Sequence, residues 1–164
     1  MKFIRPQKSG AAAASFVFQI SKQEVEWLLA VLKFYPQLNS DYHQISQGVA
    51  AEIVAGQQLL EEAMAQRRGE HKRKLDQFLA TPGRFRLEAP DQFRFTLTAE
   101  QMEWLLQVLN DVRVGCWVKL GRPELEPVPP GKLTAAEART LSALEFSGFF
   151  QMVLLGAYDG PGPA

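Results

Sequence analysis

An internal repeat limits the folds open to this chain more than any other feature of the sequence. Residues 16–33, FVFQISKQEVEWLLAVLK, match residues 93–110, FRFTLTAEQMEWLLQVLN, at a constant offset of 77 positions. Eight of these 18 positions are identical, including Trp27/Trp104 and Phe18/Phe95. Two copies of one segment predict two copies of one structural unit.

Each copy changes its hydrophobic period partway along. Residues 16–20 and 93–97 alternate between apolar and polar side chains, which is typical of a half-buried strand. Ser21 and Thr98 follow, and each stands three residues before a Glu or Gln, the pattern of a capping box at a helix start. The apolar residues beyond them have helical spacing. Each copy therefore predicts a strand, a cap and an amphipathic helix.

A second alternating segment, at residues 84–88, precedes the second copy and is followed by a turn at 89–91. Residues 2–5 can play the same part before the first copy. The sequence therefore predicts two β-β-α units, at about 2–38 and 84–120. We expect an α+β fold in which the two units form a four-stranded antiparallel sheet with pseudo-twofold symmetry. Helices are expected to cover one face of this sheet.

The remaining segments are predicted to be helical. Linking helices are expected within about 45–80, ending before Thr81-Pro82-Gly83. Thr134 with Glu137 forms a third capping box, which predicts a terminal helix at about 134–158. At 164 residues the chain fits one domain, predicted at 1–158 with a disordered tail at 159–164.

Composition excludes several classes of protein. The chain has 18 basic and 18 acidic residues, so its zero net charge argues against an overall nucleic-acid or membrane-surface binder. One cysteine, Cys116, cannot form an internal disulfide, which favours a reducing compartment and predicts a cytoplasmic protein. Residues 141–158 are apolar but include Glu145 and Gln151, so no membrane span is expected.

The strongest polar cluster lies on the second-unit helix, at Asn110, Asp111 and Arg113. Asn110 and Arg113, three residues apart, are expected to share a helix face. Glu145 and Gln151 interrupt the terminal helix, and Glu145 is a natural partner for Arg113. Two interpretations follow: a polar pocket that binds a ligand or partner, or a structural Arg113–Glu145 pair. Because an unpaired buried charge is costly, the structural pair is favoured.

A basic run, RRGEHKRK, occupies residues 67–74. Its five cations suggest phosphate contacts with nucleic acid. However, Glu61 and Glu62 lie one or two turns upstream, and no aromatic residue interrupts the run to stack on bases. A solvated helix face is therefore favoured over a nucleic-acid site. The cations are Arg67, Arg68, Lys72, Arg73 and Lys74.

Arginine alternates with apolar residues in the second hairpin, at residues 84–87 and 93–95. Since successive strand residues point to opposite faces, this pattern predicts an exposed arginine face on the sheet. Such a face suits an anionic ligand or a partner protein.

Catalytic chemistry has little support in the sequence. His43 and His71 are the only histidines, and the sequence contains no HExxH, GxSxG, glycine-rich phosphate loop or paired Cys/His spacing. We therefore expect no catalytic residue, no metal site and no cofactor. Cys116 is predicted to be a buried, unreactive thiol, with Arg113 the one neighbour able to lower its pKa. Trp27 and Trp104 are predicted to pack in the core.

Three stretches of the chain resemble a bacterial domain-of-unknown-function family, DUF2017-like and best represented in actinobacteria. They are residues 109–113 with 119–121, residues 149–154, and the basic helix ending at Leu79-Ala80. Together they cover about half of the chain. The resemblance implies a small, intracellular, mostly helical domain without established catalytic residues and with a regulatory or stress-response role. The chain departs from the family pattern in its phenylalanine-rich second hairpin and single cysteine.

Three functional hypotheses remain open from the sequence. The favoured one is a non-enzymatic regulatory or adaptor protein that acts through protein contacts, as a homodimer or with another partner. The second is a small-ligand-binding protein or enzyme that uses a pocket near Asn110, Arg113 and Glu145. The third is a nucleic-acid-binding regulator that uses the basic helix at 67–74.

Overall fold

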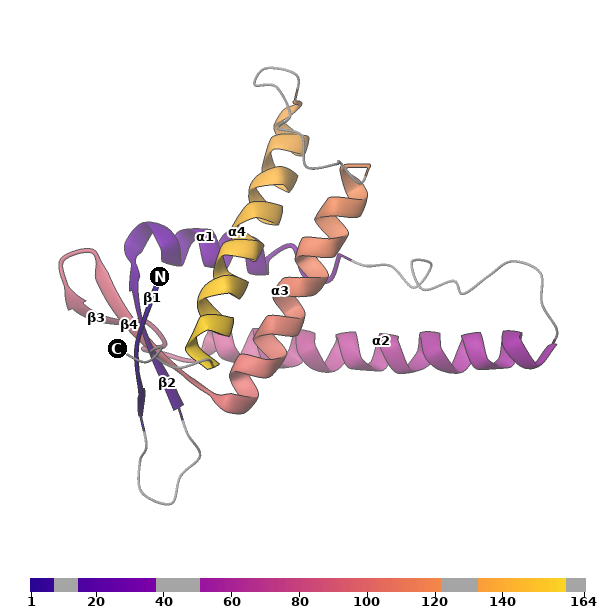
Figure 1. Ribbon diagram of the computed structural model, residues 1–164, viewed down its shortest axis with the longest axis horizontal. Helices are drawn as coiled ribbons and strands as arrows, with labels where there is room; N and C mark the ends of the chain where they lie inside the picture. Colours follow the sequence, from indigo (N-terminus) through magenta and orange to yellow (C-terminus); the bar gives the residue numbers. More distant parts are fainter. Residues whose placement is uncertain (8–14, 38–50, 122–132, 159–164) are drawn as a thin grey trace.

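The computed structural model describes residues 1–7, 15–37, 51–121 and 133–158. The tail predicted at 159–164 and the start of the linking segment at 45–50 lie outside these residues. Figure 1 shows two strand–strand–helix units with a long helix between them and another helix after them. The elements are β1 (Lys2–Gln7), β2 (Ser15–Ser21), α1 (Lys22–Leu32), α2 (Ala51–Ala80), β3 (Arg86–Ala89), β4 (Gln92–Thr98), α3 (Ala99–Lys119) and α4 (Ala135–Tyr158).

The four strands form one antiparallel sheet in the order β1-β2-β4-β3, which confirms the predicted α+β fold class. The two strands of the sequence repeat, β2 and β4, lie side by side in the centre, and each outer strand pairs with the strand that follows it. The pseudo-twofold symmetry of the two units stays a prediction.

Both predicted capping boxes of the repeat are present. The Ser21 hydroxyl accepts from the backbone N–H of Glu24, and the Thr98 hydroxyl accepts from that of Gln101. In return, the Glu24 side chain accepts from the backbone N–H of Ser21, and the Gln101 side chain accepts from the backbone N–H of Thr98. These reciprocal bonds satisfy N–H groups that a helix start leaves free, so each strand turns into a helix without a linker.

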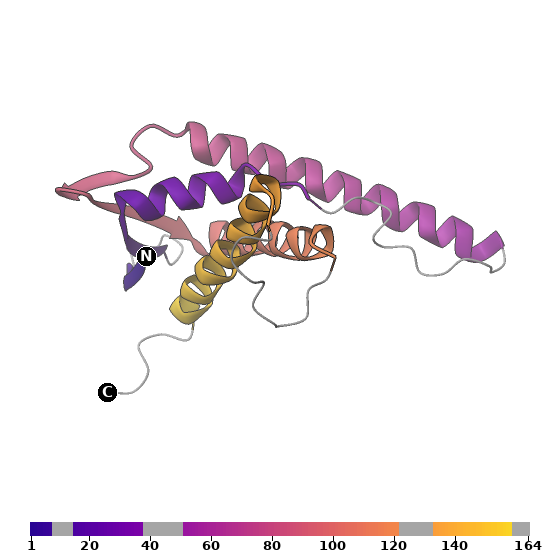
Figure 2. The same ribbon diagram turned by 90° about the horizontal axis from the view of Figure 1, so that it is seen from above.

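The core lies between one face of the sheet and the helices α1, α3 and α4. Phe18, Phe95 and Leu97 point from the central strands into it and are fully buried. The closest helix pair is α3 with α4, which cross over this face (Figures 1 and 2). Trp104 is buried in the core and Trp27 stacks on Phe146 with centroids 4.4 Å apart, so the packing role predicted for both tryptophans is confirmed.

The linking segment forms one continuous 30-residue helix, α2. Its C-terminal part is anchored by Leu75 and Phe78, which are buried in the core. Figures 1 and 2 show that its N-terminal part extends past α3 and away from the rest of the described molecule. The C-terminal end of α2 thus packs on the core, whereas its N-terminal part is not covered by the other described elements.

α4 has the length and hydropathy of a membrane span, with a mean hydropathy of 1.3, and it alone passes this test among the described residues. It also packs along α3 and contributes Phe150 and Leu154 to the core. Core helices of soluble proteins meet the same criteria, so the cytoplasmic placement expected from the sequence stays a prediction.

Candidate binding site

A cleft of about 390 Å³ lies between α2 and α3, beside the segment that follows α1. The cleft brings together two sets of residues that the sequence treated as separate sites: Arg67 and Arg68 of the basic run, and Asn110 and Asp111 of the polar cluster. We call this the α2–α3 cleft. It is lined by Tyr35, Met64, Arg67, Arg68, His71, Leu106, Gln107, Asn110 and Asp111.

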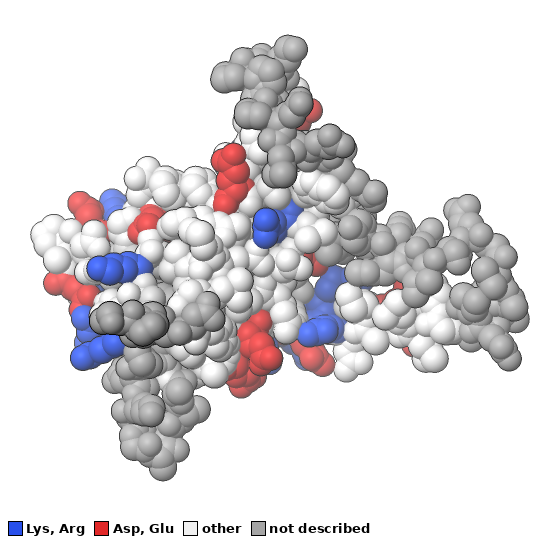
Figure 3. All heavy atoms as spheres, in the orientation of Figure 1, with Lys and Arg blue, Asp and Glu red and all other residues white. Residues whose placement is uncertain are grey.

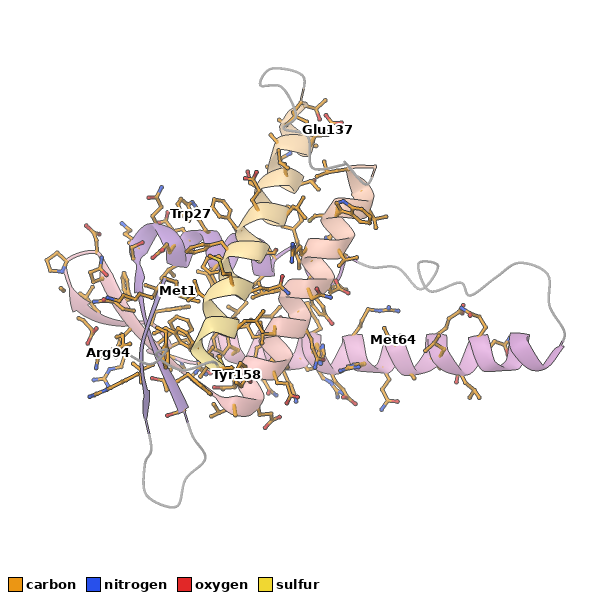
Figure 4. The ribbon with its side chains drawn as sticks, viewed as in Figure 1. Met1, Trp27, Met64, Arg94, Glu137 and Tyr158 are labelled. Atoms are coloured by element: carbon orange, nitrogen blue, oxygen red, sulfur yellow. The ribbon has the colours of Figure 1, made fainter. Side chains whose placement is uncertain are left out.

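The helical period explains how α2 forms one wall of the cleft. Leu75 and Phe78 lie on one face of α2, and His71, Met64 and Leu60 continue that face towards the N-terminus at intervals of four, seven and four residues. Burial falls along this face, from Leu75 at 1% exposed to Leu60 at 36% exposed. Figure 4 labels Met64 on the part of α2 that extends past α3. One face of α2 is therefore buried in the core at its C-terminal end and exposed to solvent towards its N-terminal end.

Hydrogen bonds fix the positions of several groups in the cleft. An Nη of Arg67 donates to the side-chain oxygen of Gln107 on α3 at 2.6 Å, and the Tyr35 hydroxyl donates to the Arg68 carbonyl at 3.3 Å. Asp111 accepts from the backbone N–H of Gln37 at 2.7 Å. Nη1 of Arg68 is buried and has no hydrogen-bond partner within the described part of the chain. Among the described residues of the cleft, this guanidinium therefore has a buried donor that is not used.

Burial also sets the protonation states in the cleft. Burial raises the pKa of Tyr35 to about 12, and the nearby Asp111 carboxylate acts in the same direction. Burial lowers the pKa of His71, and the positive charges of Arg67 and Lys74 lower it further. At neutral pH Tyr35 is thus a neutral phenol and His71 a neutral imidazole. The positive charge of the cleft comes from its two arginines.

Two polar groups of the cleft are engaged with the protein's own backbone. The Tyr35 hydroxyl is engaged with a backbone carbonyl, and the Asp111 carboxylate holds the Gln37 backbone. No group of three or more His, Cys, Asp or Glu residues that could hold a metal occurs among the described residues. The cleft offers apolar surface from Met64 and Leu106 beside two cationic side chains.

The polar cluster predicted on α3 meets two different neighbours, α2 and α4. Asn110 lines the α2–α3 cleft, whereas Arg113 points towards α4, where its Nη1 donates to Gln151 at 3.5 Å. Asn110 and Arg113 are separated by about 60° on a helix of 3.6 residues per turn. With α2 and α4 packed on different sides of α3, that angle is enough to direct the two side chains to different neighbours.

The predicted structural pair between Arg113 and Glu145 is absent. Both residues are exposed, and no ion pair between described residues joins them. The partner of Arg113 is Gln151, which is buried and whose amide also donates to the Leu106 carbonyl at 3.5 Å. An exposed arginine keeps its hydration, so it needs no carboxylate to compensate for burial.

Two of the five cations of the basic run form ion pairs within the protein. Lys72 pairs with Asp76 one turn on, and Lys74 pairs with Glu100 at the start of α3 at 2.9 Å. Arg67 is bonded to Gln107, as described above, and Arg73 is exposed. Figure 3 shows Lys and Arg side chains with acidic neighbours where α2 leaves the body of the molecule. This mixture of charges does not favour the nucleic-acid interpretation.

Cys116 is fully buried on α3, as the sequence predicts. Burial raises the pKa of its thiol, which disfavours the reactive thiolate. The charge that opposes this shift is Lys119, one turn towards the C-terminus, and not Arg113, which the sequence favoured.

Tyr35, Met64 and Gln107 also line the cleft, although no sequence motif marks them as site residues. Tyr35 follows the first-unit helix and carries no motif, and Met64 reads as ordinary apolar periodicity. The continuation of the Leu75 face through His71 and Met64 is a signal that was present in the sequence, but it does not show where α3 stops covering α2.

Comparisons with known protein families, with curated proteins and with solved structures find no match. The resemblance to the DUF2017-like family therefore stays a prediction.

Proposed function

We propose that this protein is a non-enzymatic regulatory or adaptor protein that acts through protein contacts on the open face of α2, with a second copy of the chain as its partner. The observation that carries the proposal is the α2 face itself. The face is buried at Leu75 and Phe78, and it continues through Met64 and Leu60 where α3 no longer covers it. An apolar helix stripe of this kind is suited to packing against another helix.

The charged residues beside this apolar stripe can form ion pairs with the same residues of a second copy. Glu61 and Arg68 lie on the same flank of the stripe, seven residues apart, with Met64 and Ala65 midway between them. If two copies of α2 pack antiparallel about that midpoint, Glu61 of each copy faces Arg68 of the other. A twofold contact repeats every interaction, so this geometry forms two ion pairs across one interface.

The first experiment measures the molar mass of the full chain by size-exclusion chromatography with light scattering across a dilution series. Leu60→Glu places a charge in the proposed interface and is expected to give a monomer. Leu79→Glu is the matched control, because Leu79 lies on the same helix with a similar exposed fraction, 38% against 36%, but away from the open stretch. A wild-type chain that stays monomeric at every concentration would overturn the proposal.

A charge exchange tests the antiparallel arrangement. Glu61→Arg and Arg68→Glu each place like charges opposite one another, and each is expected to weaken the dimer about tenfold or more. The double variant restores opposite charges and is expected to recover most of the affinity. Circular dichroism confirms that each variant is folded. Single variants that dimerise like the wild type, or a double variant no better than the singles, would contradict this interface.

A further inference from the structure

We propose that the face of the sheet opposite the core is a binding site for a small, multiply charged phosphate anion, separate from the α2–α3 cleft. A hollow of about 330 Å³ lies on this face, next to the turn that joins α2 to β3. Four arginines line it, each from the sheet or that turn: Arg5, Arg84, Arg86 and Arg94. Thr81 and Thr96 complete the polar side chains of its wall.

The strand register explains why the arginines gather. Arg94 of β4 pairs directly with Arg86 of β3, and Val17 of β2 pairs with Arg5 on one side and Thr96 on the other. These residues alternate with Phe18 and Phe95, which point into the core, so they lie on the opposite face. Paired residues on adjacent strands have Cα atoms only about 4.5–5.5 Å apart. The fold thus places like charges side by side, an arrangement that is unfavourable without a counter-charge.

The counter-charge supplied by the described residues is incomplete. Glu88 pairs with Arg94, yet Nε of Arg94 is buried and has no hydrogen-bond partner in the described part of the chain. Arg84 stacks over the Phe78 ring at 4.3 Å, and its Nε donates to the Phe78 carbonyl at 3.4 Å. Arg84 is therefore held in place by neutral groups, with no carboxylate partner among its described contacts. Four cations against one acid leave an excess positive charge in the hollow.

The chemistry of the hollow selects the class of ligand. Arginine presents a planar fork of donors that matches phosphate oxygens, and several such forks suit an anion with more than one charge. The volume has room for several water-sized groups, at roughly 30 Å³ each, so an ion as large as pyrophosphate can enter. Phe95 is 2% exposed and packs on the core side. Among the described residues that line the hollow, no aromatic ring is exposed for stacking, which disfavours a single-stranded nucleic acid.

Isothermal titration of the full chain with inorganic pyrophosphate tests this site. We expect saturable binding of one ion per chain, and a Kd raised about tenfold or more by Arg86→Gln and by Arg5→Gln. Both arginines are exposed, so their loss should leave the fold intact. Arg73→Gln removes an exposed arginine from α2 and is the matched control, expected to bind like the wild type. Failure to bind pyrophosphate, or equal weakening by Arg73→Gln, would overturn the proposal.

Further titrations separate phosphate recognition from general attraction of anions. Citrate carries a comparable charge, but its carboxylates are spread further apart than the phosphate groups of pyrophosphate. It therefore matches the neighbouring arginine side chains less well, and we expect it to bind at least about tenfold more weakly. Equal affinity for citrate, or tighter binding of a single-stranded oligonucleotide lost in Arg86→Gln, would contradict a phosphate site. The Leu60→Glu variant is expected to bind pyrophosphate normally, which keeps this proposal independent of the α2 contact.

Discussion

Phe18 and Phe95, which occupy equivalent positions in the two sequence repeats, are direct partners in the central strand pair of the sheet, and their rings stack with centroids 5.3 Å apart. Phe3 lies against Phe18 at 5.6 Å and Phe85 against Phe95 at 5.4 Å, so each half supplies two rings to one row across the sheet. The row is the base on which the helices pack. It joins the two halves through side chains as well as through backbone hydrogen bonds.

The central ring pair predicts coupling between the two halves of the molecule. Phe18→Leu and Phe95→Leu each remove one ring while keeping an apolar side chain. Because paired aromatic rings contribute about 0.5–1.5 kcal/mol beyond their buried area, a double-mutant cycle in free energy of unfolding should give a coupling in that range. Urea denaturation measures it. Additive single effects would show that the stacking contributes nothing of its own.

The capping boxes predict a specific loss of stability. Ser21→Ala and Thr98→Ala each remove an acceptor for a helix-start N–H, and each should lower the free energy of unfolding by about 0.5–2 kcal/mol. Thr140→Ala is the control, since Thr140 is mid-helix in α4 and its hydroxyl only donates to the Ala136 carbonyl. That change is expected to stay within about 0.5 kcal/mol. Unchanged midpoints for both cap variants would contradict the capping role.

Two helical glycines are expected to respond differently to alanine. At Gly115 on α3 an added Cβ would collide with the Gln37 side chain and lie 3.1 Å from its carbonyl carbon, so Gly115→Ala should cost about 1–3 kcal/mol. At Gly148 on α4 the nearest atom is the flexible Arg113 side chain at 3.7 Å. Gly148→Ala should be neutral or stabilise by up to about 1 kcal/mol, because alanine favours helix. Thermal and urea unfolding of the two variants provide the comparison, and equal effects would contradict the close packing of Gln37 against Gly115.

Arg113 and Glu145 are expected to be energetically independent. Both are exposed and no ion pair joins them, so a double-mutant cycle with Arg113→Ala and Glu145→Ala should give a coupling within about 0.5 kcal/mol of zero. The cycle of Arg113→Ala with Gln151→Ala is the matched comparison, because these two side chains touch. A coupling between Arg113 and Glu145 larger than that between Arg113 and Gln151 would restore the structural pair.

His71 predicts a pH dependence of stability. Burial, together with Arg67 and Lys74, lowers its pKa in the folded state, so the unfolded chain takes up a proton first as the pH falls. The free energy of unfolding should therefore decrease as the pH drops below about 6.5, the usual histidine pKa. His71→Gln should reduce this decrease between pH 7.5 and the lowered folded-state pKa. Equal pH dependence in the two proteins would show that His71 does not contribute.

The sequence predicted part of the candidate site, but not how its residues are brought together. The sequence pointed to Arg67, Arg68, Asn110 and Asp111, and all four line one cleft, but it assigned them to two unrelated sites. It also added Arg113 and Glu145, which the structure places elsewhere. The alternation of arginine with phenylalanine was more reliable, since a strand has a strict period of two and the face of each residue follows directly.

The sequence by itself determined the local structure of this protein: the change from period two to 3.6 in both repeats, the caps at Ser21, Thr98 and Thr134, and the α+β class. These features depend on neighbours within four residues, so the chain encodes them directly. The tertiary structure alone decided which side of α3 faces α2 and where α2 leaves the core. Those depend on contacts such as Arg67 with Gln107, 40 residues apart, and on the packing of whole helices, where a rotation of about 60° changes a side chain's partner.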